Sequence, residues 1–532
     1  MHGRALRRIL TVVIVATTTF ALYWPVLGFE LRSDDYQWIQ HAHAAQVQPS
    51  LLLADLGGFY RPLNTWTLLV DRLVWGGNPM GYHLTNLLLH VTASLSLLYA
   101  ARRLGFSRVA SVSIALLWAA SPFAEEPAVW VSARFQTLLF MAWMGTIAAW
   151  PRRGERWSPR RRSAVAAFML LGALSKESWV VLPLIGALLE FHRTNGSWQR
   201  AIRSVAPWSL LSFVYVIAYF SAIPGDKDYF LWSARALAKF PHMCAAFLQF
   251  EELLPTGFVL TWHSVAATAA VLITTIYGII RRSVATYIGV GCLVLSALPV
   301  VFVPYLPTRY TVLPYAGFLL LMADSVVAVY RQASPRFRLP LGLGLTGLLA
   351  VLMVAGITVV RADVIDYGRV ATATARVIQE AKSALPMLDL ERPLVVVRDE
   401  KVNPLEDIFR SPHGRFKTWA VRGTDAYGLV DTAALFEWAI GDHGVVVKRI
   451  DDWEQRFAGT PGSLLIHREG GFIISTKPIP DIAAQAANWR TAGHAVQVIV
   501  VERLTESNRR AGRFPGLTRP APGAQEAASM LQ

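Results

Sequence analysis

Charged residues are scarce in this 532-residue chain, and cysteines are almost absent. Asp, Glu, Lys and Arg make up 16% of the sequence, where about 25% is typical of soluble domains. The mean hydropathy is +0.38. The two cysteines, Cys244 and Cys292, lie far apart, and Cys292 falls in an apolar run. These features argue against an ordinary soluble protein, and they exclude a disulfide framework or a cysteine metal motif.

A glycine-rich phosphate loop and internal repeats are also missing from the sequence. Without such a loop, no segment is suited to hold the diphosphate of a nucleotide at a helix N-terminus. Without repeats, the chain shows neither a solenoid pattern nor the inverted halves that many transporters have.

Long apolar runs are abundant instead, and 54% of the residues are hydrophobic. A membrane-spanning helix needs about 20 predominantly apolar residues. The first run follows Arg4, Arg7 and Arg8, is long for a signal peptide and lacks an A-x-A cleavage site, so we expect an uncleaved signal anchor. In total the sequence predicts roughly eleven spans, near 8–28, 82–101, 109–123, 135–150, 163–176, 178–192, 205–223, 263–280, 284–304, 310–330 and 340–360.

Positive charge is unevenly distributed between the loops that join these spans. The net charge is +15, and residues 1–360 hold 29 Lys and Arg against 15 Asp and Glu. With eleven spans, 20 of the 29 basic residues fall on the side of the N-terminus. The positive-inside rule then places the N-terminus in the cytoplasm and residues beyond 360 across the membrane. This accounts for the basic balance without nucleic acid as a partner.

Residues 361–510 have a different pattern from the spans. Short β-rich runs at 394–397, 445–447, 463–466, 471–474 and 496–501 predict buried strands, and helices are expected near 370–384, 432–440 and 481–492. We therefore expect a membrane domain at 1–360, a small periplasmic α/β domain at 361–510 and a disordered tail at 511–532.

A group of polar residues is predicted at or just below the non-cytoplasmic surface. Any one of them, taken alone, is explained equally well by snorkelling at a span end. Their gathering from six segments on one side instead indicates a site that binds an anion and removes a proton. They are Asp34, Asp35, Arg61, His83, Asn86, Glu125, Glu126, Arg134, Lys176, Glu177, Arg309 and Tyr310.

The order of motifs around these residues resembles the polytopic GT-C glycosyltransferases. It is most similar to the protein O-mannosyltransferase-like group, including the membrane half of the tetratricopeptide-bearing transmembrane O-mannosyltransferases. The resemblance covers roughly 10–330, and the C-terminal 170 or so residues depart from that subgroup because they lack tetratricopeptide repeats. The motifs are Asp-Asp at 34–35, Tyr-Arg-Pro-Leu at 60–63, Gly-Tyr-His-Leu-Thr-Asn at 81–86, Glu-Pro-Ala-Val-Trp-Val-Ser-Ala-Arg at 126–134, Leu-Ser-Lys-Glu-Ser at 174–178 and Arg-Tyr-Thr-Val-Leu-Pro at 309–314.

The resemblance implies an α-helical polytopic membrane protein of GT-C-like fold and an inverting transfer from a polyprenyl-phosphate sugar to a hydroxyl. It implies Asp34 or Asp35 as the base, with Asp35 slightly favoured. Glu125 or Glu126 would bind acceptor or sugar hydroxyls. The phosphate would meet Arg61, Arg134, Lys176 or Arg309, of which Lys176 and Arg309 are preferred. The acceptor (protein, lipid A or envelope polysaccharide), the sugar and a possible divalent cation stay open.

Two other functions compete with this interpretation. A transporter or lipid flippase would place charges at mid-span and show inverted repeats. An inactive GT-C-like scaffold would present its C-terminal domain to a partner, but the Asp34-Asp35 pair argues against it. The expected location is a bacterial inner membrane, with membrane lipids, a polyprenyl-phosphate sugar and an acceptor as partners.

Overall fold

The structure is a computed structural model that describes residues 2–32, 34–46, 48–56, 58–222, 239–249, 261–302, 308–387, 393–398, 437–438, 445–450, 453–468, 471–474, 480–492 and 495–503. The chain divides into two compact units. The first comprises Met1–Val26, Gly58–Asn64 and His83–Val364, and the second comprises Leu27–Gly57, Thr65–Tyr82 and Ile365–Gln532. The tail predicted at 511–532 lies outside the described residues.

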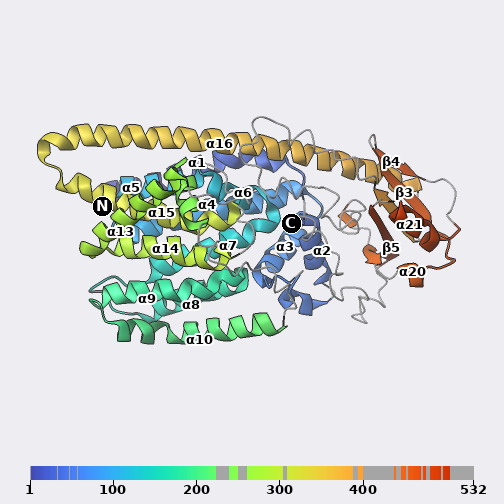
Figure 1. Cartoon of the computed structure of the whole chain (residues 1–532), viewed down its shortest axis with the longest axis horizontal. Helices are drawn as coiled ribbons and strands as arrows, with labels where there is room; N and C mark the ends of the chain where they lie inside the picture. Colours follow the sequence, from blue (N-terminus) through green and yellow to red (C-terminus); the bar gives the residue numbers. More distant parts are fainter. Residues whose placement is uncertain are drawn as a thin grey trace. The chain divides into compact units, whose positions relative to one another are not determined.

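The first unit is built from helices (Figure 1). Three short 3-10 turns, η3 (Val131–Ala133), η4 (Glu177–Val181) and η6 (Thr308–Thr311), interrupt them. The helices are α1 (His2–Tyr23), α4 (Pro79–Arg103, from His83 onward), α5 (Arg108–Ala119), α6 (Pro122–Val129), α7 (Arg134–Ala149), α8 (Pro159–Ser175), α9 (Leu182–Arg193), α10 (Trp198–Ala222), α12 (Lys239–Gln249), α13 (Trp262–Ile280), α14 (Val284–Val301), α15 (Val312–Gln332) and α16 (Pro335–Ala384, up to Val364).

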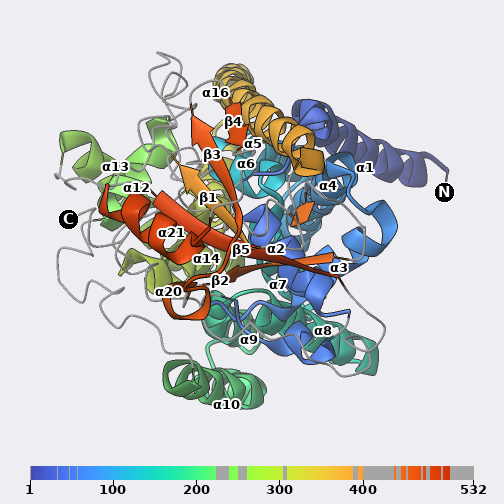
Figure 2. The same cartoon turned by 90° about the vertical axis from the view of Figure 1, so that its right-hand side faces the viewer.

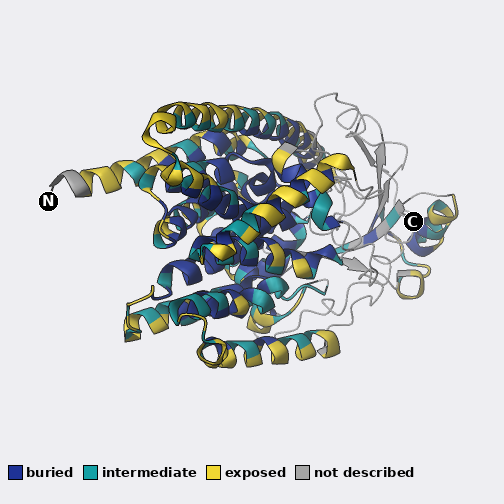
Figure 3. Cartoon of the chain, turned by 60° about the vertical axis from the view of Figure 1, so that its left-hand side comes forward, coloured by how far each residue is buried: buried dark blue, intermediate teal, exposed yellow. Residues whose placement is uncertain are grey.

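Seven segments of the described chain are long and apolar enough to cross a membrane, which makes the protein an integral membrane protein. They are Ala5–Gly28, Pro79–Arg103, Trp198–Ser221, Trp262–Ile280, Val284–Val301, Thr308–Gln332 and Pro335–Ser383. Large apolar side chains on α10, including Leu210, Phe213 and Ile217, are exposed, as expected for a surface that faces lipid. Figure 3 colours the exposed residues of the chain yellow and the buried ones dark blue.

The other four predicted spans are also helical, but their helices are shorter than the roughly 20 residues that a membrane-spanning helix needs. They are α5 with 12 residues, α7 with 16, α8 with 17 and α9 with 12. The run at 109–123 is divided because Ser121 and Pro122 occupy the N-cap and first position of α6. The run at 178–192 begins with η4 before α9 starts.

Helices α14 and α15 pack closely in the core of the first unit. A Cβ atom added at Gly317 would lie 2.4 Å from the Leu293 nitrogen and 2.6 Å from the Gly289 carbonyl oxygen. A side chain at Gly317 would therefore force the two backbones apart. The indole of Trp118 on α5 donates to the Val312 carbonyl oxygen at 3.1 Å, which ties the start of α15 to the same core.

The second unit contains α2 (Asp35–Ala44), η2 (Pro49–Leu53), most of α3 (Pro62–Trp75), the end of α16 and a five-stranded sheet. The strands are β1 (Leu394–Arg398), β2 (Val445–Ile450), β3 (Ser463–Arg468), β4 (Gly471–Ile474) and β5 (Ala495–Arg503), found at all five predicted places. Their order is β2-β5-β1-β3-β4, and β1 pairs with β3 in parallel whereas the other pairs are antiparallel.

Helix α21 (Ile482–Thr491) covers one face of this sheet (Figure 2). Ile482 and Ala486 pack against Val395 of β1 and Val498 of β5. The Asp481 carboxylate accepts from the amides of Ala483 and Ala484 and so caps the helix. The sheet is also accompanied by the short α20 (Trp453–Arg456). The helix predicted at 370–384 is the end of α16, and of the one predicted at 432–440 only 437–438 are described.

Within the second unit, Glu437 and Trp438 are bound to one face of α2. The Glu437 carboxylate accepts from Gln40 Nε2 at 2.9 Å and contacts His43 Nδ1 at 3.1 Å. The Trp438 ring lies edge-on to Tyr36, with ring centroids 6.0 Å apart. Because Tyr36, Gln40 and His43 are spaced at i, i+4 and i+7, they share one face of the helix. Glu437 and Trp438 therefore fix the position of the helix that begins at Asp35.

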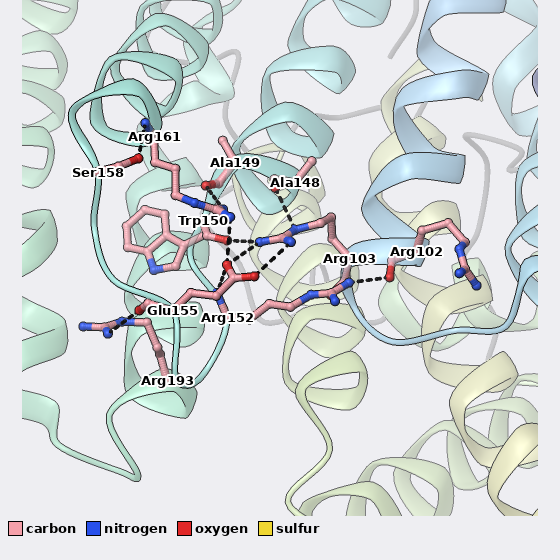
Figure 4. Close-up of polar contacts among 10 residues, drawn as sticks. All are labelled: Arg102, Arg103, Ala148, Ala149, Trp150, Arg152, Glu155, Ser158, Arg161 and Arg193. Carbon is pink, nitrogen blue, oxygen red and sulfur yellow. Dashed lines mark hydrogen bonds and ion pairs between the residues drawn. The ribbon is translucent and has the colours of Figure 1, made fainter. Parts of the chain in front are cut away.

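Glu155 joins several helix ends in the first unit (Figure 4). Its carboxylate accepts from Arg103 Nη2 at 2.8 Å and from the Arg152 amide at 3.0 Å, and lies 2.9 Å from Arg161 Nη2. The guanidinium groups of Arg103, Arg152 and Arg161 also donate to carbonyl oxygens at the C-terminal ends of α4 and α7. These oxygens belong to Arg102, Arg103, Ala148, Ala149 and Trp150.

The Arg103 hydrogen bond lowers the pKa of Glu155 from 4.5 to about 2. A carboxyl whose pKa is lowered by folding stabilises the protein above its unfolded pKa, and this contribution is lost as the pH falls from 4.5 toward 2. Because 35% of the side chain is exposed, solvent screening reduces the contribution to about 1 kcal/mol. We expect Glu155→Gln to lower the free energy of unfolding by about that much at pH 7 and by less at pH 3.

Thermal unfolding in detergent at both pH values measures this difference. Glu454→Gln is the matched control, because the Glu454–Arg490 pair is more than half exposed on both sides and a loss near zero is expected. A destabilisation by Glu155→Gln that is the same at pH 7 and pH 3 would contradict the assigned role of the Glu155 charge.

Candidate functional site

Asp34 and Asp35 lie where α2 begins, in the second unit. The Asp35 side chain is fully buried, and its Oδ2 accepts from the Arg32 amide at 3.1 Å. The Tyr36 hydroxyl donates to the Leu31 carbonyl oxygen at 2.7 Å and holds the same turn. Asp35 is thus an acidic residue in the first turn of a helix, a position where the helix dipole interacts favourably with negative charge.

The other ten candidate residues belong to the first unit. Most of them lie at helix ends or in the short turns between helices, and Arg61 lies just before α3. Lys176 is the C-cap residue of α8, Glu177 begins η4, and Arg309 and Tyr310 lie within η6. His83, Asn86, Glu125 and Arg134 are buried as well.

Glu126 and Arg309 form a buried ion pair between α6 and η6. Glu126 Oε1 accepts from Arg309 Nη1 at 2.7 Å, and Oε2 accepts from the Arg309 amide at 2.9 Å. Glu126 is fully buried. Asn86 on α4 donates to the carbonyl oxygens of Pro127 and Trp130 at 3.2 and 2.9 Å, which fixes the end of α6. The end of α6 is therefore held by α4, and its Glu126 by η6.

Cations and aromatic rings alternate along a row next to this pair, which we call the cation–aromatic row: Arg61, Phe135, Lys176, Tyr310 and Arg309. The Phe135 ring has the Arg61 guanidinium carbon 3.8 Å from its centroid and the Lys176 ammonium at 5.4 Å. The Tyr310 ring has Lys176 at 3.9 Å and Arg309 at 5.1 Å. Such contacts stabilise a cation that has lost its water.

Two of the three cations in the row are matched by a carboxylate. Arg61 Nε lies 3.3 Å from Glu177 Oε1, and Arg309 pairs with Glu126. Lys176 donates instead to the Gln136 side-chain oxygen at 2.8 Å. Within the described part of the chain, no carboxylate lies within ion-pair distance of Lys176, although its side chain is only 4% exposed. The row and its two partner carboxylates therefore contain three basic side chains against two acidic ones.

The structure thus brings together six of the predicted residues: Arg61, Glu126, Lys176, Glu177, Arg309 and Tyr310. Arg134 is fully buried, and its Nε donates to the Val131 carbonyl oxygen at 3.2 Å, so it supports the turn before α7. Phe135 and Gln136 were missed by the sequence analysis. Their signal was their place directly after the motif that ends at Arg134, but uncharged residues in an apolar run carry little information alone.

Among the described residues, no three His, Cys, Asp or Glu side chains are grouped as metal ligands. His41 and His43, which have H-x-H spacing, contact the Leu51 carbonyl oxygen and Glu437 respectively.

Comparison with known proteins gives one curated relative. No family model matches the chain. Protein O-mannosyl-transferase Tmtc2 of Drosophila melanogaster is 29% identical over 268 residues, which cover 46% of this chain. The resemblance to the O-mannosyltransferases is confirmed. The chain spans about a quarter of that relative, because the match covers 28% of its length.

Two solved proteins align with the chain at low identity. ArnT from Cupriavidus metallidurans, bound to undecaprenyl phosphate, is 15% identical, with a TM-score of 0.43 over 81% of this chain and 77% of its own. The oligosaccharyltransferase AglB from Archaeoglobus fulgidus, in complex with an inhibitory peptide and a dolichol-phosphate, is 12% identical, with a TM-score of 0.44 over 67% of this chain and 55% of its own.

Breaking the Glu126–Arg309 pair on one side should be strongly destabilising. Glu126→Gln leaves the Arg309 charge buried without its carboxylate, which costs about 3–5 kcal/mol in comparable buried pairs. The double change Glu126→Gln/Arg309→Gln removes both charges and should recover most of that loss. Chemical unfolding in detergent measures both variants. Equal destabilisation by the single and the double change would show that the charge pairing is not what stabilises this contact.

Proposed function

We propose that the protein is a membrane glycosyltransferase that moves a sugar from a polyprenyl-phosphate donor to an acceptor hydroxyl, with inversion, on the non-cytoplasmic face. The sequence similarity to an O-mannosyl-transferase supports the reaction class. The observation that carries the proposal is the buried Lys176 in the cation–aromatic row, which has no carboxylate partner in the described chain.

A phosphate group suits the charge of this row. A buried ammonium without a counter-ion is costly, and an anionic ligand would remove that cost. With three basic side chains against the carboxylates of Glu126 and Glu177, the row and its partners suit a phosphodiester, which carries one negative charge. The guanidinium groups of Arg61 and Arg309 already bind carboxylates, so Lys176 would make the principal contact with the phosphate. The polyprenyl chain would lie against apolar helix surfaces, where each buried CH₂ contributes about 0.8 kcal/mol.

The chemistry requires a base as well as a binding site for the leaving group. In the proposed reaction the acceptor oxygen attacks C1 of the sugar from the face opposite the phosphate. The C1–O bond breaks, and the phosphate leaves with the electron pair while the hydroxyl proton passes to a carboxylate. Asp35, or Asp34 next to it, is the proposed base, and Lys176 stabilises the charge that develops on the leaving phosphate. Glu125 and Glu126 remain the candidates for hydroxyl contacts.

The donor class is tested with purified protein in detergent. We expect sugar transfer from a polyprenyl-phosphate sugar and none from the corresponding nucleotide sugar. Lys176→Ala should lower the transfer rate at limiting donor by at least about 10-fold, and Lys176→Arg should restore it only in part because a guanidinium differs in shape. Lys382→Ala, an exposed position in the last turn of α16, is the control. Transfer from a nucleotide sugar without polyprenyl phosphate would refute the proposal.

The base is tested by Asp35→Asn and Asp34→Asn, singly and together. The amide keeps the shape of the side chain but cannot accept the proton, so the responsible variant should lose about 10²–10⁴-fold in kcat. Thermal unfolding confirms that the variants are folded, and Glu454→Gln serves as a carboxylate control. Near-normal kcat in the double variant would exclude both residues and leave Glu125 or Glu126 as the next candidate.

A further inference from the structure

We propose that the sugar of the donor binds beside the cation–aromatic row, against an aromatic wall made of Tyr60, Trp179 and Tyr215. This inference rests on the proposed function, because it assigns a place to the group that the phosphate carries. The wall belongs to the first unit. It draws one residue each from the segment before α3, from η4 and from α10.

The rings of the wall contact one another. Trp179 lies edge-on to Tyr215, with centroids 5.7 Å apart and an angle of 83° between the rings. Tyr60 and Tyr215 are 6.1 Å apart. Tyr215 also stacks on Tyr219 at 6.2 Å, and the Tyr219 hydroxyl donates to the Gly58 carbonyl oxygen at 3.0 Å. These contacts fix the segment that carries Tyr60 against α10, so the wall is held by packing on both sides.

Chain connectivity places the wall next to the phosphate-binding cation. Tyr60 directly precedes Arg61, and Trp179 follows Lys176 by three residues. The Trp179 amide donates to the Lys176 carbonyl oxygen at 3.1 Å, so the two residues are one turn apart. The Arg61–Glu177 ion pair joins the two segments. In a phosphate-linked sugar, C1 is one oxygen away from phosphorus, so the sugar must lie directly beside the phosphate.

Several buried polar atoms of the aromatic wall and of Glu177 make no hydrogen bond within the described chain. Trp179 is fully buried, and among the described residues its Nε1–H has no hydrogen-bond acceptor. The Tyr215 hydroxyl and Glu177 Oε1 likewise make no hydrogen bond within the described chain, although Glu177 contacts Arg61 as an ion pair. Buried polar groups are nearly always hydrogen-bonded in native proteins. The Trp179 N–H is a donor, the Glu177 oxygen an acceptor and the Tyr215 hydroxyl can be either, so together they suit a ligand rich in hydroxyl groups.

A hexose fits both properties of the wall. Its C–H faces pack on aromatic rings, and its hydroxyl groups accept from an indole N–H and donate to a carboxylate. Binding sites of this kind combine aromatic walls with a few placed polar groups that set orientation and specificity. Tyr60, Trp179, Tyr215 and Glu177 are therefore assigned to recognition of the sugar, and Lys176 to recognition of the phosphate.

The test compares two lipids that differ only in the sugar. Polyprenyl-phosphate mannose and the same polyprenyl phosphate without sugar are titrated against purified wild type, Trp179→Phe and Tyr215→Phe in detergent. Each change keeps an aromatic ring and removes one hydrogen-bonding group. We expect each variant to bind the mannose-bearing lipid about 3- to 10-fold more weakly and the bare lipid as wild type does. Tyr287→Phe, beside Phe191 and His192 and outside the wall, is the control.

Separate outcomes decide the inference and the function on which it rests. Lys176→Ala should weaken the binding of both lipids to the same extent. If Trp179→Phe and Tyr215→Phe weakened the binding of both lipids equally, or of neither, the assignment of the sugar to the aromatic wall would be overturned, whereas the proposal that Lys176 binds the phosphate would stand. Failure of wild type to bind either lipid would overturn the proposed function itself.

Discussion

Compensation of buried charge is the constraint on which the proposed site depends. An ionised group inside an apolar helix bundle is costly unless a counter-charge, hydrogen bonds or aromatic faces surround it. The first unit meets this requirement for Glu126 by binding both of its oxygens to Arg309. The charge of Arg61 is compensated by the Glu177 carboxylate and the Phe135 ring. Lys176 has the Gln136 amide oxygen and the Tyr310 ring as neighbours. In the proposed function, the lipid phosphate would balance the charge of Lys176, which has no carboxylate partner among the described residues.

Helix ends make such an arrangement possible. In an uninterrupted span every backbone amide and carbonyl is used by the helix, and only side chains are available for a ligand. The short helix α6 and the turns η3, η4 and η6 bring helix ends close together. Lys176, Glu177 and Arg309 lie at these helix ends. Asn86 satisfies carbonyl oxygens that these interruptions expose. The departures from long spans are therefore the features that build the site.

The sequence predicted the helices better than their lengths. Where the structure describes them, all the predicted spans are mainly helical, because apolar content is a local property that hydropathy measures directly. The same measure does not tell a lipid-facing helix from one surrounded by protein, and α7 is buried on nearly every face. Ser121-Pro122 did contain the signal that ends the run at 109–123. The predicted membrane topology placed Lys176 and Arg309 on the same side. It could not predict that Arg309 pairs with Glu126, because these residues are 183 positions apart and meet only through tertiary packing.

The contact of Glu437 and Trp438 with α2 has a consequence for the evolution of the chain. Helix α2, with Asp35 in its first turn, is formed by residues near the N-terminus, yet its Tyr36, Gln40 and His43 face is covered by side chains from some 400 positions later. A change at either position alters the fit of the other, so the two segments are constrained to vary together. Selection on the helix that bears the candidate base therefore acts on Glu437 and Trp438 as well. Exchanging the C-terminal portion between homologues would require exchanging this face of α2 with it.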